Sequence, residues 1–217
     1  MTATRIVIFA KAPVAGLAKT RLIPALGGEQ AAWLARRMLL STLQQAQAAG
    51  VGPVELCVTP GPSDPAWACL PPVEGIAWSA QPEGDLGARM AGAADRALAG
   101  GESVLLIGTD CPELDAVRLQ HAATLLEHSD AALYPTFDGG YALLGLRRFD
   151  PRPFERMPWS TPEVAARTIE CFQSLGWRLS IGGAVHDIDE PADLRWLPAE
   201  WRIDLHPTSP PEIRLPA

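Results

Sequence analysis

Hydrophobic and polar positions follow two alternating patterns along the chain. Short apolar runs of strand length, such as Arg5–Ala10 (RIVIFA) and Ser103–Gly108 (SVLLIG), are separated by longer stretches with helical periodicity, such as Glu29–Ala49. This alternation is typical of βαβ units built around a mostly parallel sheet. The unbroken apolar character of Ser103–Gly108 predicts a central strand that is buried on both faces. The pattern as a whole predicts an α/β fold.

The same reasoning predicts the other elements. Further strands are expected at Val54–Thr59, Ile76–Ala80, Ala131–Pro135, Tyr141–Leu146 and Trp177–Ile181. Further helices are expected at Leu86–Ala99, Glu113–Glu127, Thr161–Leu175 and Asp189–Trp196. Thr161 and Asp189 stand where helix N-caps are expected. The turn residues Asp138, Gly139 and Gly140 predict a hairpin-like pair between two of the strands.

The length of 217 residues, 47% of them apolar, is sufficient for one compact domain. We predict a single domain over residues 1–197. Residues 198–217 are rich in proline and lack periodicity, which indicates an extended tail on the surface or on a neighbouring subunit and leaves a homodimer open. No apolar run approaches the roughly 18 residues of a membrane span, so we expect a cytoplasmic protein.

The formal net charge of −7 argues against a nucleic-acid-binding surface, because phosphate backbones are bound by clustered basic residues. An anionic ligand must then be small and bound locally. The chain has only two lysines, Lys11 and Lys19, and both lie in the segment that follows the first expected strand. Their clustering indicates that compact ammonium charges are needed at that place. The alternative is that the two lysines lie together by chance in a composition rich in arginine.

The segment Lys11–Leu22 (KAPVAGLAKTRL) presents Lys11, Lys19 and Arg21, with Gly16 near its centre. Open α/β sheets bind ligands just outside the carboxyl ends of their strands, so this loop is placed to hold a di- or triphosphate. It lacks the glycine that a P-loop has directly before the lysine, which leaves a P-loop kinase as a weak alternative. An exposed basic loop without a ligand is the other alternative.

Two acidic segments are candidates for a metal site. Asp110 lies in GTDCPEL, directly after the most apolar strand, where a carboxylate suits Mg²⁺ or the N-cap of the next helix. Asp187 and Asp189 lie in HDIDEPADL. We interpret that segment as a short strand and expect only one of them to face the site. Asp189 also has helix capping as an alternative role.

The set of motifs FAKAPVAGLAKTRL, EGDLGARM, GTDCPEL, DGGYALLGL, WSTPEV and DIDEPADL resembles the GT-A-like family of nucleotidyl- and glycosyltransferases. The chain is most similar to a bacterial glycosyltransferase-like branch related to 2-phospho-lactate guanylyltransferase and molybdenum-cofactor guanylyltransferase. The resemblance covers Ile6 to Leu194. It implies a three-layer α/β/α sandwich with a mostly parallel mixed sheet.

The resemblance also implies roles for individual residues. Lys19 and Arg21 hold phosphates, Asp110 is the metal-binding aspartate, and Asp189 is the second carboxylate to the metal, which is Mg²⁺ or Mn²⁺. Lys19, Arg21 and Asp110 are the expected catalytic residues. The nucleotide-binding set comprises Lys11, Gly16, Lys19, Arg21, Gly84, Asp85, Leu86, Gly87 and Arg89. The expected acceptor side comprises Asp138, Gly139, Gly140 and Tyr141.

Two of these assignments have alternatives. The segment Glu83–Met90 resembles the part of the family that closes over the nucleotide, but Asp85 could simply cap a helix. The paired glycines Gly139 and Gly140 allow the backbone to approach a ligand, and they also make ordinary turns. Relatives often have a G-x-G turn in the first loop, whereas residues 12–14 are Ala-Pro-Val here. The nucleotide preference is therefore open.

The expected function is a Mg²⁺-dependent transferase that acts on a nucleoside triphosphate or a nucleotide sugar together with a small-molecule acceptor. Nucleotidyl transfer is slightly preferred over glycosyl transfer, because Lys11, Lys19 and Arg21 offer more positive charge than a diphosphate sugar requires. The alternative is a catalytically silent module that binds a nucleotide or nucleotide sugar. The sequence indicates no general base.

Overall fold

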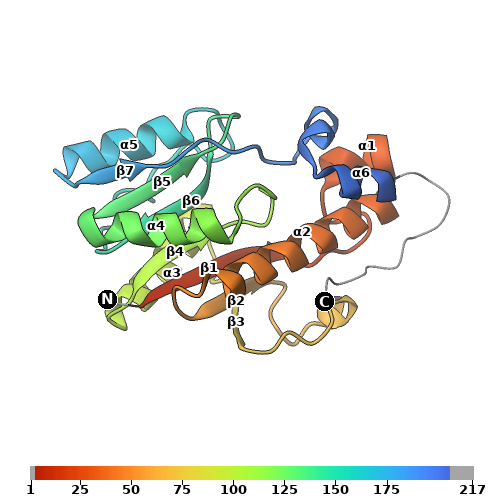
Figure 1. Cartoon of the computed structure of the whole chain (residues 1–217), viewed down its shortest axis with the longest axis horizontal. Coiled ribbons are helices and arrows are strands. Elements are labelled where there is room, and N and C mark those ends of the chain that lie inside the picture. Colours follow the sequence, from red (N-terminus) through yellow and green to blue (C-terminus); the bar gives the residue numbers. More distant parts are fainter. Residues whose placement is uncertain (1–2, 206–217) are drawn as a thin grey trace.

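The computed structural model describes residues 3–205, and seven strands form one mixed sheet in the order β3-β2-β1-β4-β6-β5-β7 (Figure 1). The strands are β1 (Thr4–Lys11), β2 (Val54–Thr59), β3 (Ile76–Ala80), β4 (Ser103–Ile107), β5 (Ala131–Pro135), β6 (Tyr141–Leu146) and β7 (Leu179–Ile181). Only β6 runs antiparallel to its neighbours, β4 and β5. The expected mostly parallel mixed sheet and the β5–β6 hairpin are confirmed.

Helices cover both faces of the sheet. The α-helices are α1 (Ile23–Leu26), α2 (Gly28–Ala49), α3 (Leu86–Ala99), α4 (Ala116–His128), α5 (Val164–Ser174) and α6 (Ala199–Asp204). Short 3-10 helices are η1 (Thr20–Leu22), η2 (Pro65–Cys69) and η3 (Pro191–Trp196). Buried residues of α2 and α4 pack on one face of the sheet, and those of α3 and α5 pack on the other. These are the three layers that the resemblance implies.

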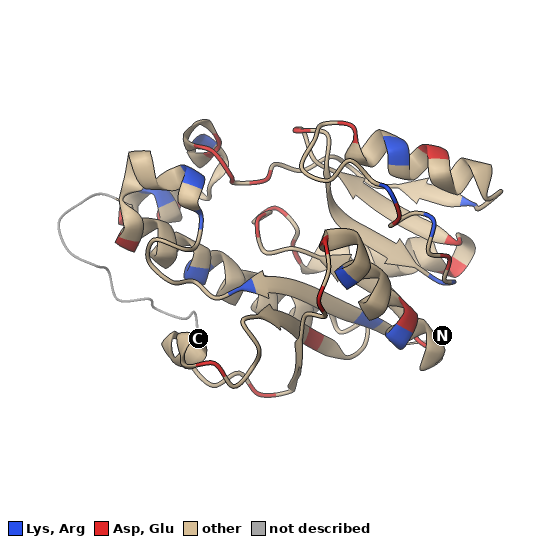
Figure 2. Cartoon of the chain, turned by 180° about the vertical axis from the view of Figure 1, so that it is seen from behind, with Lys and Arg blue, Asp and Glu red and all other residues tan. Residues whose placement is uncertain are grey.

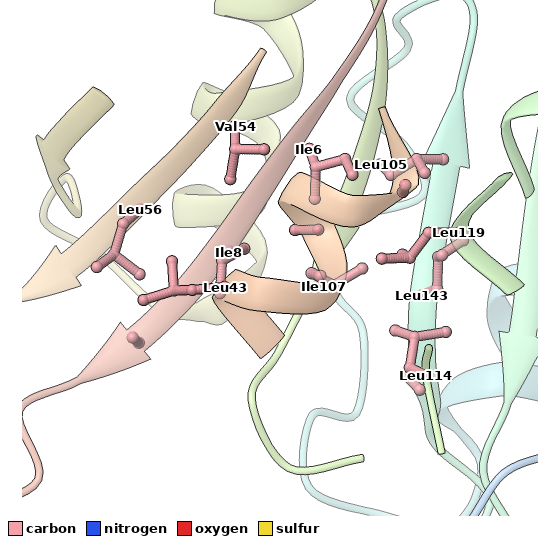
Figure 3. Close-up of a cluster of buried hydrophobic side chains, with 14 of the residues drawn as sticks. Ile6, Ile8, Leu43, Val54, Leu56, Leu105, Ile107, Leu114, Leu119 and Leu143 are labelled. Atoms are coloured by element: carbon pink, nitrogen blue, oxygen red, sulfur yellow. The ribbon is translucent and has the colours of Figure 1, made fainter. Parts of the chain in front are cut away.

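The alternation of side chains along β1 divides the core between the two faces. Ile6 and Ile8 join the cluster under α2 and α4, where Leu43 and Ile107 also lie (Figure 3). Val7 points to the other face and joins the cluster under α3 and α5. Ile6, Val7 and Ile8 are all fully buried. Burial of β1 on both faces fixes its neighbours β2 and β4 in parallel register and brings their carboxyl ends to one edge.

Two helices begin later than the sequence pattern indicates. Helix α4 begins at Ala116, because the carboxylate of Asp115 accepts a hydrogen bond of 2.9 Å from the backbone N–H of Arg118 and caps the helix. Helix α5 begins at Val164 rather than Thr161. The Thr161 hydroxyl donates instead to the carbonyl of Pro158, so the prediction that Thr161 caps this helix is wrong.

The chain after residue 188 differs most from the expectation. Glu190 occupies the N-cap position of η3 and forms a reciprocal capping box with Asp193. Helix α6 follows, and its Trp201 is 8% exposed and packs in one cluster with Leu34 and Met38 of α2. The first part of the segment that the sequence indicates as an extended tail is therefore helical and packed. Residues 206–217 of the expected tail lie outside the described residues.

The turn between β5 and β6 is in very close contact with the segment at the start of α5. Gly139 has φ +94°, and a Cβ added there would lie 2.2 Å from the carbonyl oxygen of Pro162. The carbonyl of Gly139 also accepts a hydrogen bond of 2.9 Å from the backbone N–H of Ala165. The hairpin and the start of α5 are thus docked through a position that only glycine fits.

We predict that Gly139→Ala lowers the free energy of unfolding by about 3 kcal/mol or more, because the main chain around Pro162 must move. Gly101→Ala is the matched control: Gly101 has φ +81° but open space around its Cβ position. The control should cost only the left-handed backbone, about 1–2 kcal/mol. Urea unfolding of both variants measures the difference, and equal losses would contradict the docking contact.

Candidate functional site

A pocket of about 750 Å³ opens at the carboxyl ends of the parallel strands. Its basic residues come from the loop after β1 and from α3, and its acidic residues come from the loops after β4 and β5 and from the coil that precedes η3. Figure 2 shows acidic residues in red on the loop after β4 and on this coil. The charged residues that line the pocket are Lys11, Lys19, Arg21, Arg89, Asp110, Asp138, Asp187 and Asp189.

Lys19 contacts two of the acidic residues that line this pocket. Its ammonium nitrogen lies 2.6 Å from Oδ1 of Asp110 and 2.6 Å from Oδ1 of Asp189. It also donates to the carbonyl oxygen of Ile188 at 2.7 Å. The side chain of Lys19 is only 9% exposed, and its backbone is left-handed, with φ 47°. One buried ammonium group is therefore surrounded by three oxygens that come from segments about 80 residues or more apart in the sequence.

The two carboxylates are held together by the main chain as well. The backbone N–H of Ile188 donates to the carbonyl oxygen of Asp110 at 2.9 Å, and the side chain of Ile188 is fully buried. Burial lowers the pKa of Lys19, but attraction by Asp110 and Asp189 and their hydrogen bonds outweigh it and raise the pKa above its ordinary value. Lys19 is charged at neutral pH. The side chains of Asp110 and Asp189 remain 46% and 40% exposed toward solvent.

Two other cations of the first loop are less constrained. The Arg21 side chain is 63% exposed, and its Nη1 lies 3.8 Å from Oδ2 of Asp189. Lys11 is exposed at the end of β1, and within residues 3–205 no carboxylate forms an ion pair with it. Both side chains line the pocket and can move toward an anion there. Their placement is consistent with the predicted phosphate-binding loop.

Arg89 is fixed at the pocket wall by a residue that sequence reasoning missed. Its Nη1 donates to Oε1 of Gln81 at 3.1 Å, and its Nε donates to the carbonyl of Gly84 at 2.9 Å. The amide nitrogen of Gln81 donates to the carbonyls of Ala10 and Cys57. Gln81 directly follows β3, so the rule that points to the carboxyl ends of strands also applies to it.

Asp187 lines the pocket together with Asp189, which corrects the expectation that only one of them faces the site. Residues 186–189 form irregular coil rather than a strand. The expectation would fail on a strand as well, because residues two positions apart on a strand point to the same face. Burial, followed by repulsion from Asp138 and Asp189, raises the pKa of Asp187 to about 6. Asp138 accepts a hydrogen bond of 2.9 Å from the backbone N–H of Gly140, which fixes it at the turn.

Neither of the two candidate metal ligands, Asp110 and Asp189, caps a helix. Asp115 caps α4, and Glu190 occupies the N-cap position of η3, whereas the carboxylates of Asp110 and Asp189 contact Lys19. For Asp85 the capping alternative does apply: its carboxylate accepts from the backbone N–H of Ala88 at 2.8 Å.

Ten of the fifteen predicted site residues line the pocket, although their roles stay predictions. The predicted site residues that line the pocket are Lys11, Lys19, Arg21, Leu86, Arg89, Asp110, Asp138, Gly140, Tyr141 and Asp189. Those that do not line it are Gly16, Gly84, Asp85, Gly87 and Gly139. Three of the four glycines have positive φ, and the fourth, Gly87, passes so close to the Phe154 carbonyl that a Cβ would lie 2.3 Å from it. These glycines shape the backbone that carries the site.

His186 fixes the acidic coil from outside the pocket. Its ring is stacked between Phe137 and Trp196, with centroid distances of 4.2 Å and 3.8 Å. Its Nδ1 lies 2.9 Å from Oε1 of Glu113. Two of these contacts connect His186 to segments that carry an acidic pocket residue, since Phe137 precedes Asp138 and Glu113 lies three residues after Asp110.

The residues around Lys19 fit a divalent metal ion. Within residues 3–205 no group of three or more His, Cys, Asp or Glu side chains is arranged to hold a metal. Asp110 and Asp189 would therefore supply two carboxylates, and the Ile188 carbonyl is a third oxygen directed at the same point. Mg²⁺ is commonly held by one or two carboxylates, with waters and substrate phosphates in its other positions. The oxygen donor set matches this pattern.

Residues 42–161 match the model of a bacterial family described as "uncharacterized protein conserved in bacteria (DUF2064)". This match spans more than half of the chain. The chain belongs to this family. No curated protein matches the sequence significantly.

Solved structures agree on the fold. A protein of Desulfovibrio desulfuricans G20 described as a candidate nucleotide-diphospho-sugar transferase is 34% identical, with a TM-score of 0.82 over 89% of this chain and 85% of that one. Rv0371c of Mycobacterium tuberculosis H37Rv in complex with manganese is 16% identical, with a TM-score of 0.53 over 90% and 97%. A CMP-2-keto-3-deoxy-manno-octonic acid synthetase in complex with CTP is 14% identical, with a TM-score of 0.54 over 90% and 96%.

The chain thus has the GT-A-like fold of nucleotide-diphospho-sugar transferases, as the motifs imply. The two less similar structures show the fold alone. The specific relation to guanylyltransferases stays a prediction. Among residues 3–205 we find no helix that is both long and apolar enough to cross a membrane.

We predict that His186→Ala lowers the free energy of unfolding by about 2–4 kcal/mol, because two ring stacks and the contact with Glu113 are lost. The control is His128→Ala, since His128 is exposed in the last turn of α4 and should contribute less than about 1 kcal/mol. Urea unfolding compares the two. Equal, small losses would show that the stacked rings do not fix the coil.

Proposed function

We propose that this protein is a metal-dependent transferase that acts on a nucleoside triphosphate or a nucleotide sugar and passes a group to a small-molecule acceptor. The observation that carries the proposal is the divided pocket, in which basic groups lie on one side and acidic groups on the other, with Lys19 and the two carboxylates between them. A transferase needs such a division, because it must hold a polyphosphate and an acceptor next to each other.

The basic side suits the phosphates of the donor. Lys11 and Arg21 come from the first loop and Arg89 from α3, and all three line the pocket. Arg89 is held by Gln81 and the Gly84 carbonyl, so it provides a fixed positive charge, whereas the exposed Arg21 side chain can adjust to the ligand. Pre-positioned cations stabilise the charge that collects on leaving phosphates.

Asp110 and Asp189 are the residues that would hold the metal ion. When bound, a divalent ion neutralises phosphate oxygens as a Lewis acid and helps to orient the donor. The solved structure of Rv0371c with manganese, whose fold is similar, supports a divalent metal in this fold. The main-chain bond from Ile188 to the Asp110 carbonyl holds the two segments that carry these carboxylates next to each other.

The acidic side suits the acceptor. Asp138, Gly140 and Tyr141 line it, as does Asp187, which the sequence did not indicate. Burial raises the pKa of Tyr141 above its usual range, so its hydroxyl stays protonated and can donate a hydrogen bond. Carboxylates and a protonated hydroxyl are suited to the hydroxyl groups of a small polar molecule. Trp159 lines the same side and packs edge-on against Tyr141.

Nucleotidyl transfer is the reaction that we favour. Lys19 is already neutralised by two carboxylates, yet Lys11, Arg21 and Arg89 remain as cations on the pocket wall. Three cations and a divalent ion provide enough positive charge for a triphosphate, which is more than a nucleotide sugar requires. The alternative is a silent module that binds a nucleotide or nucleotide sugar. Turnover distinguishes the two.

The reaction itself is tested by incubating the protein with Mg²⁺, labelled nucleoside triphosphates or nucleotide sugars, and a pool of small-molecule acceptors. We expect acceptor-dependent release of pyrophosphate from a triphosphate. Release of a nucleoside diphosphate from a nucleotide sugar would assign glycosyl transfer instead. Binding without any acceptor-dependent product would contradict the transferase and favour the silent module.

We predict that Arg21→Ala weakens nucleoside triphosphate binding by about tenfold or more, because a charge-assisted phosphate contact contributes roughly 1.5–3 kcal/mol. The matched control is Arg167→Ala, since the Arg167 side chain is similarly exposed, 58% against 63%, but lies on α5 outside this pocket. Titration calorimetry measures both affinities. Unchanged binding by the Arg21 variant would remove this loop from the phosphate site.

We predict that Asp110→Asn abolishes Mg²⁺-dependent ligand binding or turnover while the protein still folds, because Lys19 keeps its hydrogen bonds to Asp189 and to the Ile188 carbonyl. Asp115→Asn is the control, because both side chains are 46% exposed and Asp115 caps α4. Asparagine also caps helices, so the control should keep metal-dependent activity. If the Asp110 variant retains full metal dependence, this carboxylate is not a metal ligand.

A further inference from the structure

The ammonium group of Lys19 has no hydrogen-bond donor left for a phosphate in this structure. A lysine ammonium has three N–H donors, and three oxygens lie 2.6–2.7 Å from that of Lys19: it donates to Oδ1 of Asp189 and to the Ile188 carbonyl, and it forms an ion pair with Oδ1 of Asp110. The resemblance assigns Lys19 to phosphate binding. In its present position, Lys19 instead serves as the cation of the carboxylate pair.

A divalent metal ion would need the same oxygens. Asp110 and Asp189 direct one carboxylate oxygen each at a single point, and the Lys19 nitrogen already occupies that point. An ammonium group and a metal ion cannot both contact these two oxygens, because two positive charges at such short range in a poorly solvated place repel each other strongly. One cation must leave when the other binds.

Lys19 is able to leave. Its side chain lines the pocket, so a change of rotamer moves the ammonium from the carboxylates toward the side on which Lys11 and Arg21 lie. Lysine has a long stem with four rotatable bonds, which makes such a movement inexpensive compared with a backbone change. The segments that carry the two carboxylates, in contrast, are joined by the main-chain bond from Ile188 to Asp110.

We propose that Lys19 and the divalent metal ion are alternative occupants of the Asp110–Asp189 pair, and that metal binding transfers the Lys19 ammonium from the carboxylates to the phosphates of the donor. This inference rests on the metal assignment in the proposed function. It explains how one lysine stabilises the free protein and also binds phosphate. It further implies that metal and polyphosphate bind cooperatively, because the displaced ammonium gains a partner only when phosphate is present.

The first test measures Mn²⁺ affinity in the absence of nucleotide, by electron paramagnetic resonance of the free ion. Lys19→Met removes the competing cation and keeps most of the side-chain volume. Arg167→Met is the control, since it removes an exposed cation from α5 outside this pocket. We expect Lys19→Met to bind Mn²⁺ about tenfold more tightly or better, because two uncompensated carboxylates gain a counter-ion. The control should bind as the wild type does.

An unchanged or weaker Mn²⁺ affinity of Lys19→Met would overturn the proposal. The second test needs no variant that might unfold. Because the chain has only two lysines, wild-type protein labelled with ¹⁵N-lysine gives at most two side-chain ammonium signals, and Lys11→Met identifies the one from Lys19. The buried ammonium of Lys19, surrounded by three oxygens, is protected from exchange with water, so it should give an observable signal.

We expect Mg²⁺ to remove the Lys19 ammonium signal in wild-type protein and to leave it unchanged in Asp110→Asn. Persistence of the signal at a Mg²⁺ concentration that saturates the wild-type protein would mean that the metal binds elsewhere, and would overturn the exchange. This failure is distinguishable from failure of the proposed function. Product formation with an unmoved Lys19 would refute only the exchange, whereas exchange without product would refute only the transferase.

Discussion

A single buried ammonium group balances two carboxylates that come from segments far apart in the sequence. Lys19 follows the first strand, whereas Asp110 follows the central strand and Asp189 lies near the end of the described chain. Two carboxylates this close to each other repel strongly unless a cation lies between them. The pair is further fixed by the Ile188 main chain, which donates to the Asp110 carbonyl and accepts from Lys19. The ion pair between Lys19 and Asp189 thus helps to hold the coil that carries Asp187 and Asp189 in place.

The same arrangement divides the pocket. Cations from the loop after β1 and from α3 lie on one side, and the carboxylates of Asp138 and Asp187 lie on the other. The sheet topology produces this division: the parallel strands β1 and β4 end side by side, and the antiparallel β6 begins next to them. The sheet topology therefore brings cations and carboxylates to the same edge of the sheet, where the proposed function needs them.

The strands and the main site residues could be predicted because their signals are local. The apolar run at Ser103–Gly108 indicates a buried strand by itself, and Asp110 follows it directly. The predictions were wrong where contacts between distant residues determine the local structure. Asp187 was set aside on the expectation that only one of the two aspartates faces the site, although residues two positions apart share a face even on a strand. The segment is in fact coil, and His186 stacks between Phe137 and Trp196 next to it. The six residues of α6 are too few to show periodicity, and Trp201 is ordered by its packing on α2. The contact between Lys19 and the carboxylates is equally invisible in the sequence, because it joins residues 170 positions apart.

The most direct test of this account is a crystal structure of the protein with Mn²⁺ and a non-hydrolysable nucleoside triphosphate, in which anomalous scattering locates the metal. The account predicts a manganese peak between the carboxylates of Asp110 and Asp189, with the phosphates against Arg21 and Arg89 and the Lys19 ammonium moved onto a phosphate oxygen. The account would be contradicted by a structure in which the nucleotide lies outside this pocket, or in which manganese binds elsewhere while Lys19 still contacts both carboxylates.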